Sequence, residues 1–116
     1  MEGKELRIGN YIKHSELSDI TEVIAVGKDY IHILFNNETL YESIKWFTPI
    51  PLTEEWLLKF GFEIDNGWFK IGYLKLLPIR DLYYRAIVPI TKDIKYVHQL
   101  QNLYFALTGE ELTIKS

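Results

Sequence analysis

The chain has 116 residues, of which 47% are apolar, 25% charged and 15% aromatic, with no cysteine and a formal net charge of −3. These totals are typical of one folded domain that buries a core without disulfides. The lack of cysteine excludes thiol nucleophiles and cysteine-ligated zinc, and the negative charge argues against a dedicated nucleic-acid binder. With no leader and no apolar run of about 18 residues, the chain is expected to be cytoplasmic and not membrane-bound.

The N-terminal half has the pattern of several short strands joined by tight turns. Gly9-Asn10 marks a kink or bulge in the first of them. The predicted strands cover residues 6–14, 20–26, 30–35 and 39–44. Strands of this length and spacing predict a small curled antiparallel sheet or an SH3-like barrel over the β-rich region 6–50.

Prolines separate this half from a short helix. Pro49 and Pro51 remove backbone donors, so residues 45–52 are expected to form a connector or an edge strand. Over residues 53–61, Thr53 is a good N-cap and Gly61 a good C-terminal stop, which predicts a short helix.

A second β-rich region follows over residues 62–89. Its hairpin signal is Asn66-Gly67, preceded by Asp65, because both central positions of a type I′ turn need positive φ. Two further strands are expected at 73–79 and 82–88. Tyr84 is expected to face the core by alternation along its strand.

A long helix over residues 92–108 ends the predicted fold, with Thr91 or Asp93 as the N-cap and Gly109 as the C-terminal stop. Its apolar arc is wide enough to cover a sheet and comprises Tyr96, Val97, Leu100, Leu103, Tyr104 and Leu107. The sequence therefore predicts a single α+β domain over residues 1–116, with helices on antiparallel sheet.

The opposite face of this helix carries His98, Asn102 and Phe105, with Gln101 beside them. This face is expected to be exposed to solvent. Phe105 either tucks under a loop or tail, or belongs to a second contact face that serves as an oligomer contact or as a pocket wall.

Aromatic and cationic residues give the candidate ligand contacts. Arg80, Tyr83 and Arg85 form the densest such group, because arginine grips phosphate or carboxylate and tyrosine stacks on a base. Trp46 and Trp68 lie near predicted turns and serve either as ligand contacts or as packing.

No catalytic motif is present. The sequence has no G-x-S-x-G elbow, no phosphate-cradling glycine loop and no H-E-x-x-H. The histidines at positions 14, 32 and 98 lie too far apart in sequence to indicate a metal site. The chain is therefore expected to be no enzyme and to hold no metal or cofactor.

Three segments carry a resemblance: LRIGNYI (6–12), PIPLTEEWLLKFGF (49–62) and YVHQLQNLYFALTGEEL (96–112). Together they resemble a family of small bacteriophage and prophage proteins of gut bacteria. The resemblance implies a phage-associated origin and a setting in the host cytoplasm, and it transfers no catalytic residue.

A phage accessory protein of this kind is expected to bind something of the host. One hypothesis is capture of a small anionic, nucleotide-like ligand, such as a host immune signal. Its expected contacts are Arg80, Tyr83, Arg85, Trp68 and Trp46. The alternative is a protein–protein interaction module that blocks a host factor, with Phe105 and Trp46 as anchors. Turnover of nucleotides is the third hypothesis and ranks last, for want of a motif.

Overall fold

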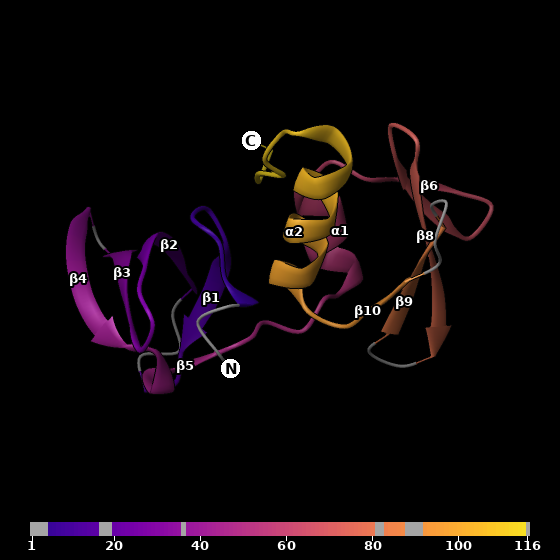
Figure 1. Ribbon diagram of the computed structural model, residues 1–116. Coiled ribbons are helices and arrows are strands. Elements are labelled where there is room, and N and C mark those ends of the chain that lie inside the picture. The colour runs from indigo at the N-terminus through magenta and orange to yellow at the C-terminus, as the bar shows by residue number, and fades with distance from the viewer. Residues whose placement is uncertain (1–4, 17–19, 36, 81–82, 88–91, 116) are drawn as a thin grey trace.

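The computed structural model describes residues 5–16, 20–35, 37–80, 83–87 and 92–115. Within these ranges, two five-stranded antiparallel sheets lie at opposite ends of the molecule, and the helices α1 and α2 lie between them (Figure 1). The molecule measures 42 × 26 × 26 Å. The predicted α+β class is confirmed, and the helices separate two sheets.

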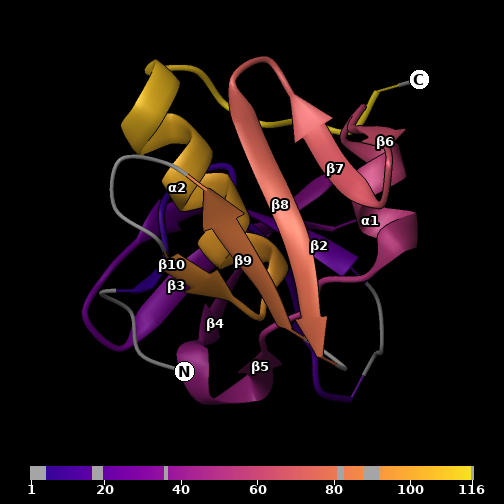
Figure 2. The ribbon, with the colours of Figure 1, turned by 90° about the vertical axis from the view of Figure 1, so that its right-hand side faces the viewer.

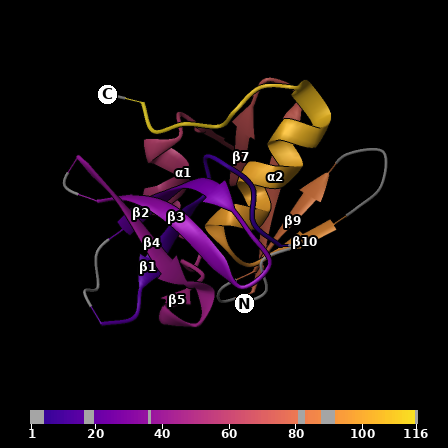
Figure 3. The same cartoon turned by 60° about the vertical axis from the view of Figure 1, so that its left-hand side comes forward.

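The first sheet is a meander whose last strand returns to its first, in the order β4-β3-β2-β1-β5. Its elements are β1 (Tyr11–His14), β2 (Ile20–Val26), β3 (Tyr30–Phe35), β4 (Glu38–Ser43), the 3-10 turn η2 (Ile44–Trp46) and β5 (Phe47–Thr48). Among the described strands none joins β4 to β5, so this half is a curled open sheet and not a closed SH3-like barrel (Figure 3).

The expected first strand over 6–14 is shorter in the structure. Gly9 has φ 97°, a left-handed conformation that breaks the extended chain before β1. The N–H of Gly9 still donates to the Val23 carbonyl at 2.7 Å, which ties the bent segment to β2. Alternation along the strands then fills one face with a first core of Leu6, Ile12, Val23, Ile31, Ile33 and Phe47.

The short helix α1 (Glu54–Lys59) begins and ends as predicted. Thr53 Oγ1 accepts a hydrogen bond from the Trp56 N–H at 3.4 Å, which caps the start. Gly61 has φ 93°, and the Phe62 N–H closes the end on the Leu57 carbonyl at 3.0 Å.

The second sheet is a simple meander in the order β10-β9-β8-β7-β6 (Figure 2). Its strands are β6 (Glu63–Asp65), β7 (Trp68–Ile71), β8 (Leu74–Arg80), β9 (Tyr83–Ile87) and β10 (Lys92–Ile94). Asn66 and Gly67 have φ of 52° and 85°, so the predicted turn with two positive φ values joins β6 to β7.

The helix α2 (Val97–Thr108) begins five residues later than predicted. Residues 92–94 form β10 and bury Ile94 in the core, and Asp93 therefore lies in a strand. Gln99 starts the helix, because its Oε1 accepts from the N–H groups of Lys95 (2.9 Å) and Tyr96 (3.1 Å). Thr91 lies outside the described residues.

Gly109 ends α2 as predicted. Its φ is 76°, and its N–H donates a hydrogen bond to the Phe105 carbonyl. The predicted apolar arc is correct for Val97 and Leu100, which are buried, and wrong for Leu107, which is 45% exposed. Leu107 lies in the last turn of α2.

The second core is separate from the first and lies between the helices and the inner face of the second sheet. Phe60, Leu76 and Leu100 are fully buried in it. Tyr11 connects the two halves: it belongs to β1 of the first sheet, yet its ring packs 5.8 Å from that of Trp56 in the second core. Burial raises the pKa of the Tyr11 hydroxyl.

Candidate functional site

A small hollow on the outer face of the second sheet contains one of the predicted ligand residues, Trp68. Its volume is about 210 Å³, and its lining residues are Asp65, Asn66, Trp68, Lys70 and Lys75. The Asn66-Gly67 turn and the register of β7 with β8 bring these residues together. Trp68 is half-buried, so one part of its ring packs on the sheet and the rest faces the hollow.

Two lysines face each other in this hollow. Lys70 on β7 pairs directly with Lys75 on β8, while Phe69 between Trp68 and Lys70 points into the core. Directly opposed like charges destabilise a sheet by a few tenths to about 1 kcal/mol. Within the described residues, no ion pair links either lysine to a carboxylate. The hollow therefore offers two ammonium groups and the Asp65 carboxylate beside a tryptophan ring, with Glu63 opposite Lys70 on β6.

Arg85 lies on the same outer face but is already paired. Its Nε donates to Asp93 Oδ1 at 2.9 Å across the β9–β10 ladder. This hydrogen bond raises the pKa of Arg85, and it satisfies the face of the guanidinium that a ligand carboxylate or phosphate would use. The structure thus places Arg85 in the sheet of Trp68 with its charge compensated.

The other predicted contacts are placed as follows. Arg80 and Tyr83 are register partners at the β8–β9 connection, and their side chains lie outside the described residues. Tyr84 is 9% exposed and packs in the second core, as predicted. Trp46 belongs to η2 in the first half, so the structure does not bring it to the Trp68 hollow (Figure 1).

The predicted contact face of α2 lies against the N-terminal segment of the same chain. Asn102 Oδ1 accepts from Asn10 Nδ2 at 2.8 Å, and Asn102 Nδ2 donates to the Glu5 carbonyl at 3.0 Å. Phe105 is 39% exposed, with the Arg7 guanidinium 4.1 Å from its ring centroid. This face is covered by its own chain, and a role as an oligomer contact or pocket wall stays a prediction.

His98 is 1% exposed, so the expectation that it faces solvent is wrong. Neither ring nitrogen has a hydrogen-bond partner among the described residues. A carboxylate oxygen of Glu5 lies 3.8 Å from Nε2, which is too long for a hydrogen bond. Burial lowers the pKa of His98, and the negative charge of Glu5 opposes that shift.

Gln101, which the sequence placed beside the solvent-facing residues of this helix, is also buried. It is fully buried; its Oε1 accepts from the Tyr11 N–H at 2.9 Å, and its Nε2 donates to the carbonyls of Gly9 (3.0 Å) and Leu112 (3.4 Å). The sequence gives no sign that Gln101 is buried, because an exposed glutamine next to the apolar arc would produce the same pattern.

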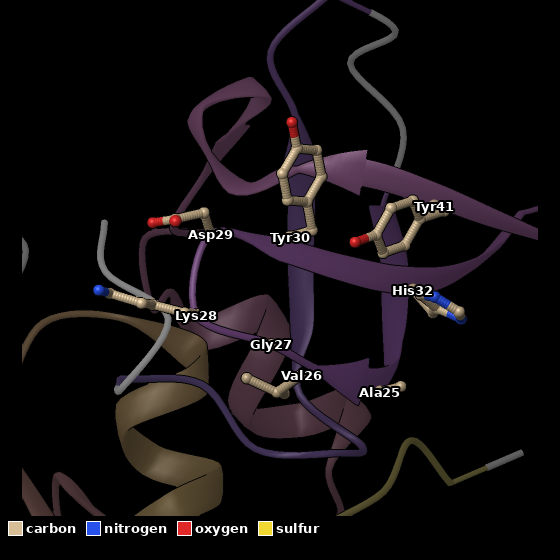
Figure 4. Close-up of a pocket in the computed structure, with 8 residues that line it drawn as sticks. All are labelled: Ala25, Val26, Gly27, Lys28, Asp29, Tyr30, His32 and Tyr41. Atoms are coloured by element: carbon tan, nitrogen blue, oxygen red, sulfur yellow. The ribbon is translucent and has the colours of Figure 1, made fainter.

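A larger pocket, of about 350 Å³, lies on the outer face of the first sheet, and sequence reasoning missed it. It is lined by residues 25–30 with His32 and Tyr41 (Figure 4). The Tyr30 and Tyr41 rings stack with centroids 5.0 Å apart, and the His32 ring meets Tyr41 edge-on at 4.7 Å. The available signal was the alternation of β3, which puts Tyr30 and His32 on the face opposite Ile31 and Ile33.

In the part of the chain that the structure describes, no group of three or more metal-ligating side chains comes together. Neither described helix has the length and apolar character needed to cross a bilayer.

Comparisons with protein-family models, curated proteins and solved structures find no match to this chain. The resemblance to phage and prophage proteins therefore stays a prediction.

Proposed function

We propose that this protein is a non-enzymatic binding protein that captures a small anionic, nucleotide-like ligand at the Trp68 hollow. The observation that carries the proposal is the direct opposition of Lys70 and Lys75 beside the half-buried Trp68 ring. Two facing ammonium groups repel each other, and an anion placed between them converts that repulsion into attraction.

The hollow favours a ligand with both a planar ring and a negative charge. A ring stacked on Trp68 gains about 1–3 kcal/mol. A phosphate held by two lysines makes charge-assisted hydrogen bonds, which are about twice as strong as neutral ones. With a volume of about 210 Å³, the hollow takes one part of such a ligand and leaves the rest in solvent.

This binding mode fits sequestration in the cytoplasm better than chemical turnover. A shallow site leaves the ligand partly hydrated, whereas catalysts exclude water from the reacting atoms. The resemblance to phage proteins supports a host nucleotide signal as the captured ligand, and this assignment rests on that resemblance alone.

Titration calorimetry with adenosine 5′-monophosphate as the probe tests the proposal. The double variant Lys70→Gln/Lys75→Gln should weaken binding at least tenfold, because two charged hydrogen bonds to phosphate are lost. Adenosine and inorganic phosphate should each bind more weakly than the whole nucleotide. Incubation for hours should leave the nucleotide unchanged.

Two control variants make this test sharper. Lys59→Gln removes a charge from α1, where Lys59 pairs with Glu55, and should leave the affinity unchanged. Arg85→Ala should also have little effect, because Asp93 already holds that guanidinium. No binding by the wild-type chain, or equal binding by the double lysine variant, would contradict the proposal.

One observation favours the alternative of a protein-blocking module. Trp46 is 39% exposed on η2, and tryptophan is enriched among the residues that anchor protein interfaces. A host protein retained by the wild type and lost with Trp46→Ala, in a pull-down from host lysate, would support this second function. Retention by both would remove Trp46 as an anchor.

A further inference from the structure

The pocket on the first sheet combines exposed aromatic rings with nearby carboxylates. Tyr41 is 63% exposed on the edge strand β4, and Tyr30, the first residue of β3, is 46% exposed. Lys28 and Asp29 line the pocket, and Glu22 pairs with Leu34 on the same face of the sheet. Glu38 and Glu42 lie on the other face, which they share with Leu40 of the first core.

Rings and carboxylates together select for a cation. The face of an aromatic ring is its negative part, so it attracts ammonium and guanidinium groups that lie over it. Arginine suits such a place better than lysine, because its guanidinium is flat, weakly hydrated and able to stack. Nearby carboxylates strengthen the attraction and raise the rate of encounter with a basic partner.

We propose that this pocket binds an arginine side chain presented by a basic segment of a partner protein. The Tyr30 and Tyr41 rings already stack on each other, so the guanidinium adds to the outside of that stack. Asp29, at the rim beside Tyr30, supplies the carboxylate. The side chains of Lys28 and Asp29 both extend to the side of the pocket away from the three rings, so the Asp29 carboxylate offsets the charge of Lys28 and the rings stay open (Figure 4).

This site is independent of the Trp68 hollow. It lies on the other sheet, at the opposite end of the molecule (Figure 1), and it selects a ligand of opposite charge. Its volume of about 350 Å³ falls within the range of side-chain and small-ligand pockets. Failure of either assignment therefore leaves the other standing.

Nuclear magnetic resonance titration with a synthetic (Arg-Gly)4 peptide tests the inference. Chemical-shift changes should concentrate at residues 25–32 and at Tyr41, and they should be far smaller with a (citrulline-Gly)4 peptide, which lacks the charge. Tyr41→Leu keeps an apolar side chain but removes the ring, and it should weaken binding about two- to fivefold. Because Tyr41 is exposed, this variant should stay folded.

Matched charge variants separate the pocket from general electrostatics. Asp29→Asn should weaken the (Arg-Gly)4 complex, whereas Asp65→Asn, which removes the same charge from the second sheet, should not. Equal effects of the two variants would overturn the inference. So would stronger binding of oligothymidylate than of the peptide, or a concentration-dependent dimer in sedimentation that Tyr41→Leu abolishes.

Discussion

His98 is a buried base that the fold holds without hydrogen bonds to its ring nitrogens among the described residues. Burial lowers its pKa in the folded state, while in the unfolded chain the pKa is near its ordinary value of about 6.5. The unfolded chain therefore binds more protons than the folded one as the pH falls below that value. Stability contributed by the neutral ring is complete above about pH 6.5 and is lost as the pH falls through the folded-state pKa.

We expect the urea midpoint of the wild type to fall between pH 7.5 and pH 5. His98→Leu should lose most of that dependence and should be at least as stable at pH 7.5, because an apolar side chain there leaves no unpaired nitrogen. His32→Gln, which removes a histidine from the sheet surface, is the control. An unchanged pH dependence in His98→Leu would show that other groups cause the acid sensitivity.

Gln101 is the opposite case, a buried polar side chain whose amide is bonded at both ends. Gln101→Leu leaves the Tyr11 N–H and the Gly9 carbonyl without partners, at a cost of about 1–3 kcal/mol for each. We expect a loss of about 2–4 kcal/mol in chemical denaturation. Ala106→Ser, on the exposed side of α2, should change stability by well under 1 kcal/mol. A neutral Gln101→Leu would mean that water replaces the amide.

Among the elements, the Asn66-Gly67 turn has a direct link to the candidate site, because it sets the β6–β7 register that places Asp65 opposite Trp68 at the hollow. Gly67→Ala should cost about 1–2 kcal/mol from backbone strain alone, since an added Cβ would meet no atom within 4 Å. Asn66→Gly should be nearly neutral, because glycine suits the same positive φ. Thermal unfolding of the two variants measures the difference, and equal melting temperatures would contradict it.

The elements show which parts of the fold could be predicted from the sequence. The start and end of α1 and the Asn66-Gly67 turn could be predicted from local sequence, because each requires a backbone conformation or a cap that few residue types supply. The start of α2 was placed too early, because Asp93 is an equally good cap in sequence. Burial of Ile94 in the second core favours β10 over an earlier helix start, and this tertiary effect leaves no local signal in the sequence.

The candidate sites were harder to predict for the same reason. Trp68 was identified, but its partners Lys70 and Lys75 depend on cross-strand register, which a single chain does not display. The three rings of the first-sheet pocket come from two strands that pair side by side, so their convergence required the structure. The covered face of α2 was expected to be wet, since periodicity shows only one apolar arc.

At the scale of the whole molecule, two separate cores meet at a mostly polar joint around α2. Tyr11 is the main apolar connection, with its ring 5.8 Å from Trp56 and 6.2 Å from Phe60. Arg7 and Glu111 add an ion pair of 2.9 Å at the edge, with both side chains partly exposed. Such a pair is worth at most about 1 kcal/mol. The packing of the Tyr11 ring is therefore the main interaction that couples the unfolding of the two halves.

We expect the slowest amides of both sheets in the wild type to exchange with the same free energy, as in one cooperative unit. Tyr11→Ala should separate them, so that β2 and β3 exchange faster than β7 and β8. Tyr11→Phe keeps the ring and should preserve the common value. Native-state hydrogen exchange measures these energies residue by residue, and two different values in the wild type would show that the halves are already independent.

The joint also determines the order in which the chain can assemble during synthesis. The contacts of Asn10 with Asn102 and of Arg7 with Glu111 span 92 and 104 residues, whereas the strands of each sheet come from one half of the chain, with Lys13 to Thr48 as the most distant pairing. The first sheet can therefore form on the ribosome while α2 has yet to be made. Until then the Asn10 side chain and the Tyr11 N–H remain without their partners on α2, Asn102 and Gln101, and a nascent chain stalled before residue 97 presents them to chaperones.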